Sequence, residues 1–435
     1  MKSGLDWSIR TVTIAVLIGL VSGDGGAGQD DVLELAGGRW FDGETFVERT
    51  VYVSDSLFVR DPGERPVRKV DLGGRYIVPP FADAHSHNLS GEPRWQEIHE
   101  TYLSEGTFYV LVMHNATSGA APIRDRLREP GTVDVAYGGA AVTSTLGYPF
   151  LRYEPRAMGL NDSSTWPDNA AAIRRSRLME DDGYVFIDST ADVESKLAEV
   201  LAQCASHLKI ILFDGERFAE QRADTQRIGH RGLDPALVPD LVARAHAADV
   251  RVIAHIETPY DFRVAVDADV DVIAHVPGYN LAPDADPAAF RLTAETARHA
   301  AERGIVVTPT VFAHRVVTDG EWARRRYEVL HHNLTLLKEH GVTVAPGTDV
   351  YGVTARPEIE ELARFDIWTH AELLAMWSTA GPRVVFPDRR IGALEPGYEA
   401  SFLALDCDPI ANLACTHRIA LRFMDGRFLE PRGSG

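Results

Sequence analysis

Histidines and one acidic residue follow several short apolar segments of this 435-residue chain, and their types are those that bind transition metals. His85 and His87 close the first such segment, His255 and His275 close two later ones, and Asp349 follows the last. Residues i and i+2 of a strand point to the same side, so the first two imidazoles face one way. Four imidazoles and a carboxylate suit Zn²⁺ or a similar divalent ion. The sequence therefore predicts a metal site, with one or two ions per chain.

Lys209 lies in an apolar segment of the same kind. An ammonium group has no lone pair with which to bind a cation. From its position alone, two roles stay open for Lys209. It is a paired or uncharged residue at the edge of the site, or it is a carbamate formed with CO₂ that serves as an anionic bridging ligand.

The segments that carry these residues read as buried parallel strands alternating with amphipathic helices. The strand segments are 76–84, 107–114, 133–142, 208–214, 250–255, 270–275, 305–310 and 342–349, and the clearest helical segments are 192–205, 234–248, 286–303 and 321–340. This α/β alternation predicts a (β/α)₈ TIM-like barrel over residues 79–383, with the active site at the carboxyl ends of its strands. A doubly wound open sheet is the other α/β architecture, but no GxGxxG turn follows any of the strands.

Short β segments with Gly and Asp breaks lie on both sides of this region. Their alternation indicates antiparallel pairing. We expect residues 30–78 and 384–430 to form one composite small β domain, a β-sandwich built from both ends of the chain.

The composition argues against some partners and some kinds of metal site. The chain has 44 Lys and Arg against 63 Asp and Glu, a net charge of −19 that disfavours nucleic acids and anionic lipid surfaces. The three cysteines show no CxxC spacing, so His and carboxylates must hold any metal. We expect a small-molecule substrate as the partner, and a homo-oligomer stays open.

Residues 1–28 have the pattern of a signal peptide. Lys2 and Arg10 precede the apolar run 11–21, and small residues follow up to Gly28, where we expect cleavage. An uncleaved anchor helix is the other interpretation, but crossing a bilayer takes about 20 apolar residues. We predict an exported protein, periplasmic or secreted, without stable membrane insertion. In that compartment a disulfide between Cys407 and Cys415 is allowed.

The segments around the candidate ligands resemble those of the metal-dependent amidohydrolase superfamily, and within it the imidazolonepropionase-like and Xaa-Pro or Xaa-Arg dipeptidase-like members. They occur in the order of that family: IVPPFADAHSH (77–87), HLKII (207–211), AHAADVRVIAH (245–255), DVDVIAHVP (269–277), GVTVAPGTD (341–349) and IGALEPG (391–397).

The resemblance implies a role for each ligand. His85 and His87 would hold the more buried metal, and His255 with His275 would hold a second one. Lys209, carboxylated on Nζ, would bridge the two ions.

The resemblance also implies the reaction, in which metal-activated hydroxide cleaves an amide, peptide or cyclic amide C–N bond. Asp349 would bind the first metal and act as general base and then as general acid. The enzyme would not be a standard endopeptidase. Ester hydrolysis or deamination at the same site is the alternative reaction, and a metal-binding barrel without catalysis is the alternative from another class.

Further polar residues at the predicted mouth are candidates for substrate contacts. His114 ends the second strand segment, Tyr279 follows His275, and His314 follows the seventh segment. His230 and Arg231 lie in the loop after the fourth segment, where a guanidinium could clamp a substrate carboxylate. The stretch 146–175 is a candidate lid.

Overall fold

The structure, a computed structural model, describes residues 32–127, 129–204, 206–224, 226–313 and 320–429. The predicted signal peptide (1–28), both outermost residues of the predicted β domain (30 and 430) and His314 lie outside these residues. In the described part of the chain, none of the helices is both long and apolar enough to cross a membrane.

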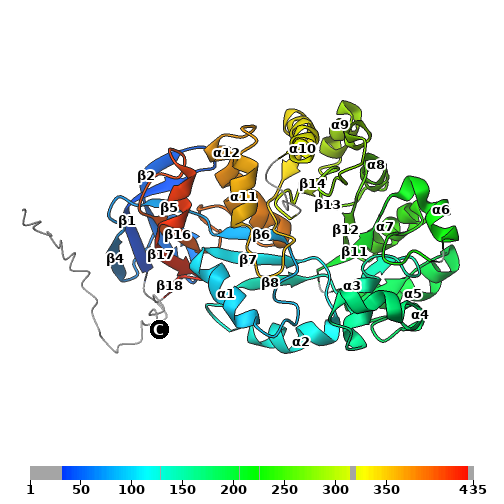
Figure 1. Ribbon diagram of the computed structural model, residues 1–435. Helices are drawn as coiled ribbons and strands as arrows, with labels where there is room; N and C mark the ends of the chain where they lie inside the picture. The colour runs from blue at the N-terminus through cyan, green and yellow to red at the C-terminus, as the bar shows by residue number, and fades with distance from the viewer. Residues whose placement is uncertain (1–31, 128, 205, 225, 314–319, 430–435) are drawn as a thin grey trace, which may run out of the picture.

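Strands from both ends of the described chain form one eight-stranded sheet (Figure 1). They are β1 (Val32–Phe41), β2 (Phe46–Ser54), β3 (Leu57–Val59), β4 (Val67–Asp71), β5 (Tyr76–Val78), β16 (Phe402–Leu405), β17 (Ile419–Met424) and β18 (Arg427–Phe428). β16 joins the two ends, because it pairs with β5 on one side and with β17 on the other. The sheet is mixed rather than antiparallel, since β1 pairs in parallel with β4 and β5. These strands form a single sheet, and the sandwich stays a prediction.

The region between these ends is α/β, and its strands pair only in parallel, in two sheets. The first consists of β6 (Phe81–Ser86), β7 (Thr107–Val112) and β8 (Asp134–Tyr137). The second has the order β10 (Tyr184–Phe186), β9 (Ala141–Thr143), β11 (His207–Ile211), β12 (Arg251–His255), β13 (Val272–Ala274), β14 (Val306–Thr308), β15 (Thr343–Val344). β6, β7 and β11 are buried at every residue, as expected for strands that are covered on both faces.

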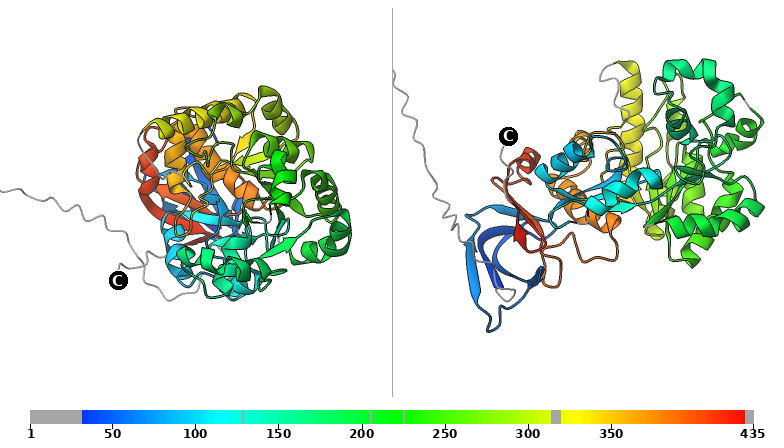
Figure 2. Two further views of the ribbon diagram at one scale, coloured as in Figure 1. Left: turned by 45° about the vertical axis from the view of Figure 1, so that its right-hand side comes forward. Right: turned by 90° about the horizontal axis from the view of Figure 1, so that it is seen from below.

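Helices surround the parallel strands (Figure 2). They are α1 (Trp95–Ser104), α2 (Thr117–Arg126), α3 (Phe150–Ala157), α4 (Trp166–Arg175), α5 (Thr190–Gln203), α6 (Phe218–Ala223), α7 (Val238–Ala247), α8 (Pro259–Asp267), α9 (Ala294–Glu302), α10 (Glu321–Glu339), α11 (Arg356–Ala363), α12 (His370–Ala375) and α13 (Gly381–Val385). The predicted lid, 146–175, contains α3 and α4, which share a small hydrophobic core with β10.

Two predicted strands are each divided in the structure. Segment 76–84 breaks at Pro79-Pro80, which has no backbone N–H groups, so β5 joins the end sheet and β6 the parallel strands. Segment 133–142 breaks at Gly138-Gly139, where Gly139 has φ +80°, so β8 and β9 belong to different sheets. The three-residue strand β10 was not predicted from the sequence.

Backbone hydrogen bonds outside the strand ladders connect the two parallel sheets. The N–H of Ala84 donates to the carbonyl of Pro346 and that of Asp349 to the carbonyl of His85, both at 2.9 Å. The N–H of Ser206 donates to the carbonyl of Tyr137 at 3.1 Å. β6 therefore lies against the segment after β15, and β8 lies beside the start of β11.

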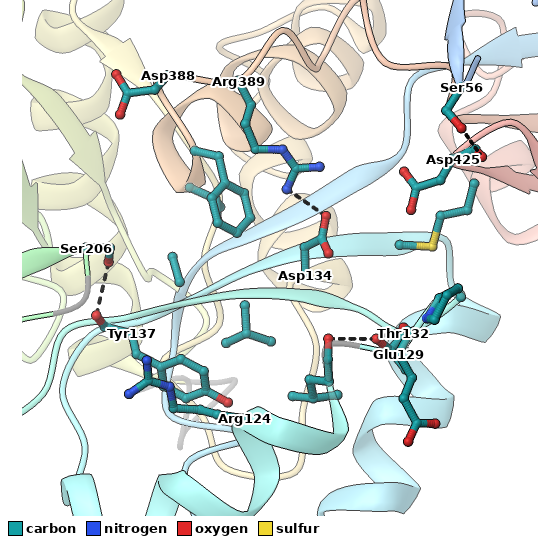
Figure 3. Close-up of a pocket in the computed structure, with 18 of the residues that line it drawn as sticks. Ser56, Arg124, Glu129, Thr132, Asp134, Tyr137, Ser206, Asp388, Arg389 and Asp425 are labelled. Atoms are coloured by element: carbon teal, nitrogen blue, oxygen red, sulfur yellow. Dashed lines mark hydrogen bonds and ion pairs between the residues drawn. The ribbon is translucent and has the colours of Figure 1, made fainter. Parts of the chain in front are cut away.

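A cavity of about 1030 Å³ lies at the amino ends of the parallel strands (Figure 3). Asp134 and Arg251, the first residues of β8 and β12, line it. Arg389 in its wall pairs with Asp134 at 2.7 Å and with Glu399 at 2.5 Å, so these half-buried charges compensate one another. The predicted metal ligands close the opposite ends of their strands, so this cavity is not their site.

Candidate active site

His85, His87 and Asp349 form the tightest group of potential metal ligands in the described part of the chain. One ligand atom from each lies within 4.8 Å of the others. Oδ1 of Asp349 is 3.4 Å from Nε2 of His85 and 3.0 Å from Nε2 of His87. Both histidines are almost fully buried, with 1% and 3% of their surface exposed.

His255 and His275 lie beside this group and face each other. Nε2 of His275 is 2.8 Å from Nδ1 of His255, and Nδ1 of His275 is 3.9 Å from Oδ2 of Asp349. The rings of His85 and His275 are 4.9 Å apart between centroids. The structure therefore brings together all four predicted histidines and Asp349.

Neighbouring hydroxyl groups fix the orientation of two of the imidazoles. Thr308, the last residue of β14, lies with Oγ1 3.2 Å from Nδ1 of His85. Thr310 lies with Oγ1 2.6 Å from Nδ1 of His275. Such contacts leave the second ring nitrogen as the one aimed at a metal in His85, and they set the direction of each ring.

Burial keeps the imidazoles of His85, His255 and His275 uncharged. It lowers the pKa of His85 to about 4 and that of His255 to about 3, and it holds the pKa of His275 well below its usual value. Neutral imidazole is the form that offers a lone pair to a metal. Burial opposes ionisation of Asp349, but the surrounding histidines hold its pKa well below the usual range, so it is a carboxylate at neutral pH.

Lys209 is a buried residue of β11, with 2% of its surface exposed. Its Nζ lies 3.7 Å from Sδ of Met113, and the carboxylates in the described ranges form no ion pair with it. Burial lowers its pKa to about 7, so much of the amine is uncharged at neutral pH. The paired-lysine role predicted from the sequence thus lacks a partner in the described chain, whereas an uncharged amine is the form that adds CO₂.

The donor set fits a divalent metal. Two imidazoles and one carboxylate converge from buried positions, which is the ligand chemistry of a catalytic zinc site with an open position. Nδ1 of His87 is buried and has no hydrogen-bond partner among the residues that the structure describes, so these residues do not engage the ring through this atom. His85, His87 and Asp349 could hold one ion, and His255 with His275 could contribute to a second.

Comparison with known proteins gives structural neighbours over nearly the whole chain. A crystal structure of an amidohydrolase superposes with a TM-score of 0.65 and 22% identity, over 92% of this chain and 98% of the other. A prolidase complexed with N-methylphosphonate-L-proline gives 0.67 and 20% identity, over 92% and 100%. The chain has the amidohydrolase fold.

Sequence comparison finds similarity over only part of the chain. No family model matches the chain. An adenine deaminase of Lactobacillus delbrueckii subsp. bulgaricus is 22% identical over 176 residues, 40% of this chain and 30% of the deaminase. The match thus spans less than a third of the length of that curated relative.

Within the amidohydrolase fold, two predicted substrate contacts lie at the histidine cluster. The ring of His114 is 4.6 Å from that of His87 between centroids, and its Nε2 is buried without a hydrogen-bond partner. Tyr279 stacks on His275 at 4.1 Å. Its hydroxyl donates to Oε1 of Glu257 at 2.8 Å, so it is already engaged.

The predicted carboxylate clamp has a different environment. The guanidinium of Arg231 donates to the carbonyl of Gln221 in α6 at 3.1 Å. His230 contacts Phe213, whose ring lies 6.0 Å from that of His230 and 6.2 Å from that of His255. Arg231 therefore connects its loop to α6.

Several residues of the site were missed by reasoning from the sequence. Glu257 is one, and its Oε1 lies 3.1 Å from Nε2 of His255. The i, i+2 spacing that singled out His85 and His87 would have found Glu257 as well. Tyr148 and Arg152 come from the predicted lid and Tyr351 from the loop after Asp349, and no local pattern marks them.

Proposed function

We propose that the protein is a metal-dependent hydrolase that cleaves a carbon–nitrogen bond of a small amide, peptide or cyclic amide. The observation that carries this proposal is the convergence of His85, His87 and Asp349 beside a second histidine pair. The names of the neighbours support it, since an amidohydrolase, a prolidase and a deaminase all act on C–N bonds. In this proposal the two parallel sheets form one (β/α)₈ barrel over 79–383, next to the composite β domain.

His85, His87 and Asp349 would hold the first metal, preferably Zn²⁺. A divalent ion there would supply a Lewis acid that acidifies water and polarises the carbonyl group of the substrate. The carboxylate of Asp349 accepts the proton from the attacking water and returns it to the leaving nitrogen. Its ionised state at neutral pH suits the first of these steps.

His114 is the residue placed to contact the substrate carbonyl oxygen. Its Nδ1 lies 2.8 Å from the hydroxyl of Tyr153. When that hydroxyl donates, the proton of the neutral ring sits on Nε2, a nitrogen without a hydrogen-bond partner in the described ranges. A donor so placed stabilises negative charge that develops on the oxygen.

Lys209 would be carboxylated in the active enzyme. Its uncharged Nζ attacks the carbon of CO₂, an N–C bond forms, and one N–H proton leaves to solvent. The carbamate is an anion that could bridge two metals, with His255 and His275 holding the second one. Its burial beside the cluster, without an acidic partner in the described chain, supports this proposal.

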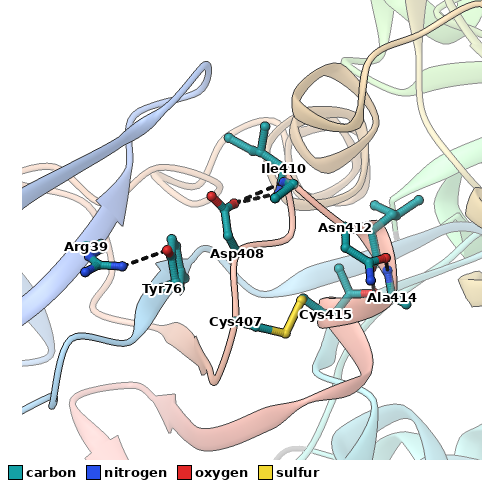
Figure 4. The surroundings of a disulfide bond; sticks show 11 residues. Arg39, Tyr76, Cys407, Asp408, Ile410, Asn412, Ala414 and Cys415 are labelled. Carbon is teal, nitrogen blue, oxygen red and sulfur yellow. Dashed lines mark hydrogen bonds between the residues drawn. A yellow bond between two sulfur atoms is a disulfide. The ribbon is translucent and has the colours of Figure 1, made fainter.

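We also propose export to the periplasm or the medium, with residues 1–28 as the signal. The Cys407–Cys415 disulfide supports an oxidising compartment (Figure 4). Ester hydrolysis or deamination remains the alternative reaction of the same residues, and metal binding without catalysis is the alternative function.

Metal content and turnover together test the proposal. Wild type, Lys209→Ala and a control, Lys196→Ala on α5, are prepared with bicarbonate and analysed for metals. We expect about two metals per chain in wild type and in the control, and one or fewer in Lys209→Ala. The preparations are then assayed with dipeptides, N-acyl amino acids, cyclic amides, esters and aminopurines.

The outcomes separate the hypotheses. Equal metal content in wild type and Lys209→Ala removes Lys209 from the ligands. Turnover of esters or aminopurines alone favours the alternative reaction. Bound metal without turnover of any substrate class favours the non-catalytic barrel, and a protein that binds no metal contradicts the proposal as a whole.

A further inference from the structure

Arg152 is a cation on a firmly held helix at the histidine cluster. It lies in α3, and Glu154, two residues further along the same helix, is fully buried. Glu154 accepts hydrogen bonds from the hydroxyl of Tyr184 at 2.5 Å and from the N–H of Met179 at 2.8 Å. Phe150 in the first turn of α3 packs in the hydrophobic core shared with β10. The backbone that carries Arg152 is therefore fixed.

Two tyrosines connect Arg152 to the candidate metal ligands. Its Cζ lies 5.1 Å from the ring centroid of Tyr351, and Tyr351 stacks on His87 with centroids 5.8 Å apart. The guanidinium also interacts with the phenol of Tyr148, which stacks on His255 at 5.3 Å. One tyrosine ring thus lies between Arg152 and a histidine of each pair.

In the described part of the chain this guanidinium forms no ion pair with a carboxylate, unlike the guanidinium groups of Arg356 and Arg389. Arg389 pairs with Asp134 and Glu399, and Arg356 pairs with Glu105. Arginine stays charged at all relevant pH values, and its planar fork binds carboxylates through two parallel hydrogen bonds. Tyr351 beside it is 46% exposed, so the position is open to solvent.

We propose that Arg152, assisted by the hydroxyl groups of Tyr148 and Tyr351, binds a carboxylate of the substrate. The substrate is then an acid-bearing amide, such as an N-acyl amino acid or a dipeptide, whose scissile bond lies at the histidine cluster. This inference rests on the proposed hydrolase function and narrows its substrate class. It moves the carboxylate contact from Arg231 to a residue of α3.

The test compares acids with matched neutral compounds. Release of acetate is measured from a panel of N-acetyl-L-amino acids and from their N-methylamides, with the metal-loaded wild type, Arg152→Met, Arg152→Lys and Arg156→Met. Arg156 is an exposed arginine of the same helix and serves as the control. Binding of N-acetyl-L-alanine and of its N-methylamide is measured in parallel by calorimetry, and thermal unfolding shows whether each variant is folded.

We expect wild type to prefer the acids. Arg152→Met should lower kcat/KM for the acids by about 10- to 150-fold, mainly through KM, because a charge-assisted contact is lost. Its activity on the N-methylamides should not change, Arg152→Lys should recover part of the loss, and Arg156→Met should behave as wild type.

Other results separate the inference from the function on which it rests. Equal turnover of acids and N-methylamides, or an equal loss on both in Arg152→Met, overturns the carboxylate subsite and leaves the hydrolase in place. Turnover of neutral cyclic amides alone does the same. If no amide is cleaved, the hydrolase proposal is wrong. The binding measurement then decides on the subsite. Tighter binding of N-acetyl-L-alanine to wild type than to Arg152→Met supports the subsite, whereas equal binding overturns it.

Discussion

Oδ1 of Asp349 lies 3.0 Å from Nε2 of His87, although one residue follows β15 and the other follows β6. Backbone pairing fixes this approach, because the N–H of Asp349 donates to the carbonyl of His85 at 2.9 Å. Asp83 strengthens the junction, since its carboxylate accepts from the N–H of Thr348 at 3.1 Å. The candidate metal group therefore depends on close contact between the first and last parallel segments.

Gly347 makes this contact close enough. A Cβ added at Gly347 would overlap the backbone N and the Cβ of His85, which are themselves fixed in β6. We expect Gly347→Ala to push the two segments apart and to lower both metal content and the free energy of unfolding, the latter by about 1–3 kcal/mol as in other overpacked sites. Metal analysis and urea unfolding measure these effects. The control is Gly119→Ala in α2, where the nearest atom to the new Cβ would be 3.4 Å away. Equal metal content in the two variants would contradict this account.

Asp349→Asn tests the proton transfer assigned to this carboxylate. Asp349 has φ +52°, a conformation that asparagine also tolerates, so the backbone should be kept. The amide cannot take up the proton, and we expect kcat to fall by about 10²- to 10⁴-fold, the usual contribution of a general base. Asp366→Asn, at an exposed residue with φ +54°, is the control. A variant that keeps its metal and more than a tenth of wild-type kcat would remove Asp349 from the proton transfer.

Thr310 tests whether the orientation of His275 matters. Thr310→Val removes the hydroxyl that lies 2.6 Å from Nδ1 of His275 and keeps the shape of the side chain. Loss of such an orienting partner typically lowers metal affinity or activity by about 10- to 100-fold. Thr335→Val is the matched control, because the hydroxyl of Thr335 is buried without a hydrogen-bond partner. Competition with a metal chelator gives the affinities, and equal values for both variants would show that the contact is not functional.

The local pattern of the chain predicts most of the parallel strands and the candidate ligands, but not the strand β10. His85, His87, His255 and His275 each close an apolar segment, and such segments end on one side of a parallel arrangement. The proximity of these four histidines could therefore be predicted without knowledge of side-chain packing. Asp349 followed from the same rule, because its segment is the last of the series.

The residues that were missed depend on contacts between distant segments. Arg152 contacts Tyr351 because α3 lies beside the loop that follows Asp349. The sequence 146–175 shows no feature that fixes where this stretch lies. Arg231 was predicted as a clamp because it follows β11, and the structure adds that its guanidinium donates to the carbonyl of Gln221 in α6. The division of two strands, by contrast, follows from local residues, because Pro79-Pro80 and Gly138-Gly139 interrupt their segments.

The disulfide should stabilise the loop between β16 and β17. Cys407 and Cys415 are eight residues apart, and closing a loop of this size contributes about 2.5 kcal/mol through the entropy of the unfolded chain. We expect the double substitution Cys407→Ser and Cys415→Ser to lower the free energy of unfolding by about 2 kcal/mol. Cys204→Ser, at the free cysteine, is the control. Urea unfolding measures both, and equal stability of the double variant and of oxidised wild type would argue against a stabilising role of the disulfide.

Glu358, which is not one of the candidate metal ligands, should make the free energy of unfolding depend on pH. This buried residue of α11 accepts hydrogen bonds from the N–H groups of Val311 and Phe312 at 2.9 and 2.7 Å, and these residues follow Thr310. Burial raises its pKa from 4.5 to about 8, so the folded protein holds a proton here that the unfolded chain has lost at neutral pH.

The stabilising contribution of this proton is fully present below pH 4.5 and is lost as the pH rises toward about 8, with a slope of up to about 1.4 kcal/mol per pH unit. Glu358→Gln does not titrate, so wild type should exceed the variant in stability most at pH 5, and this difference should shrink toward pH 8. Urea unfolding of both proteins at several pH values gives the difference, in which the other titrating groups cancel. A difference that stays constant over this range would show that Glu358 is ionised in the folded protein.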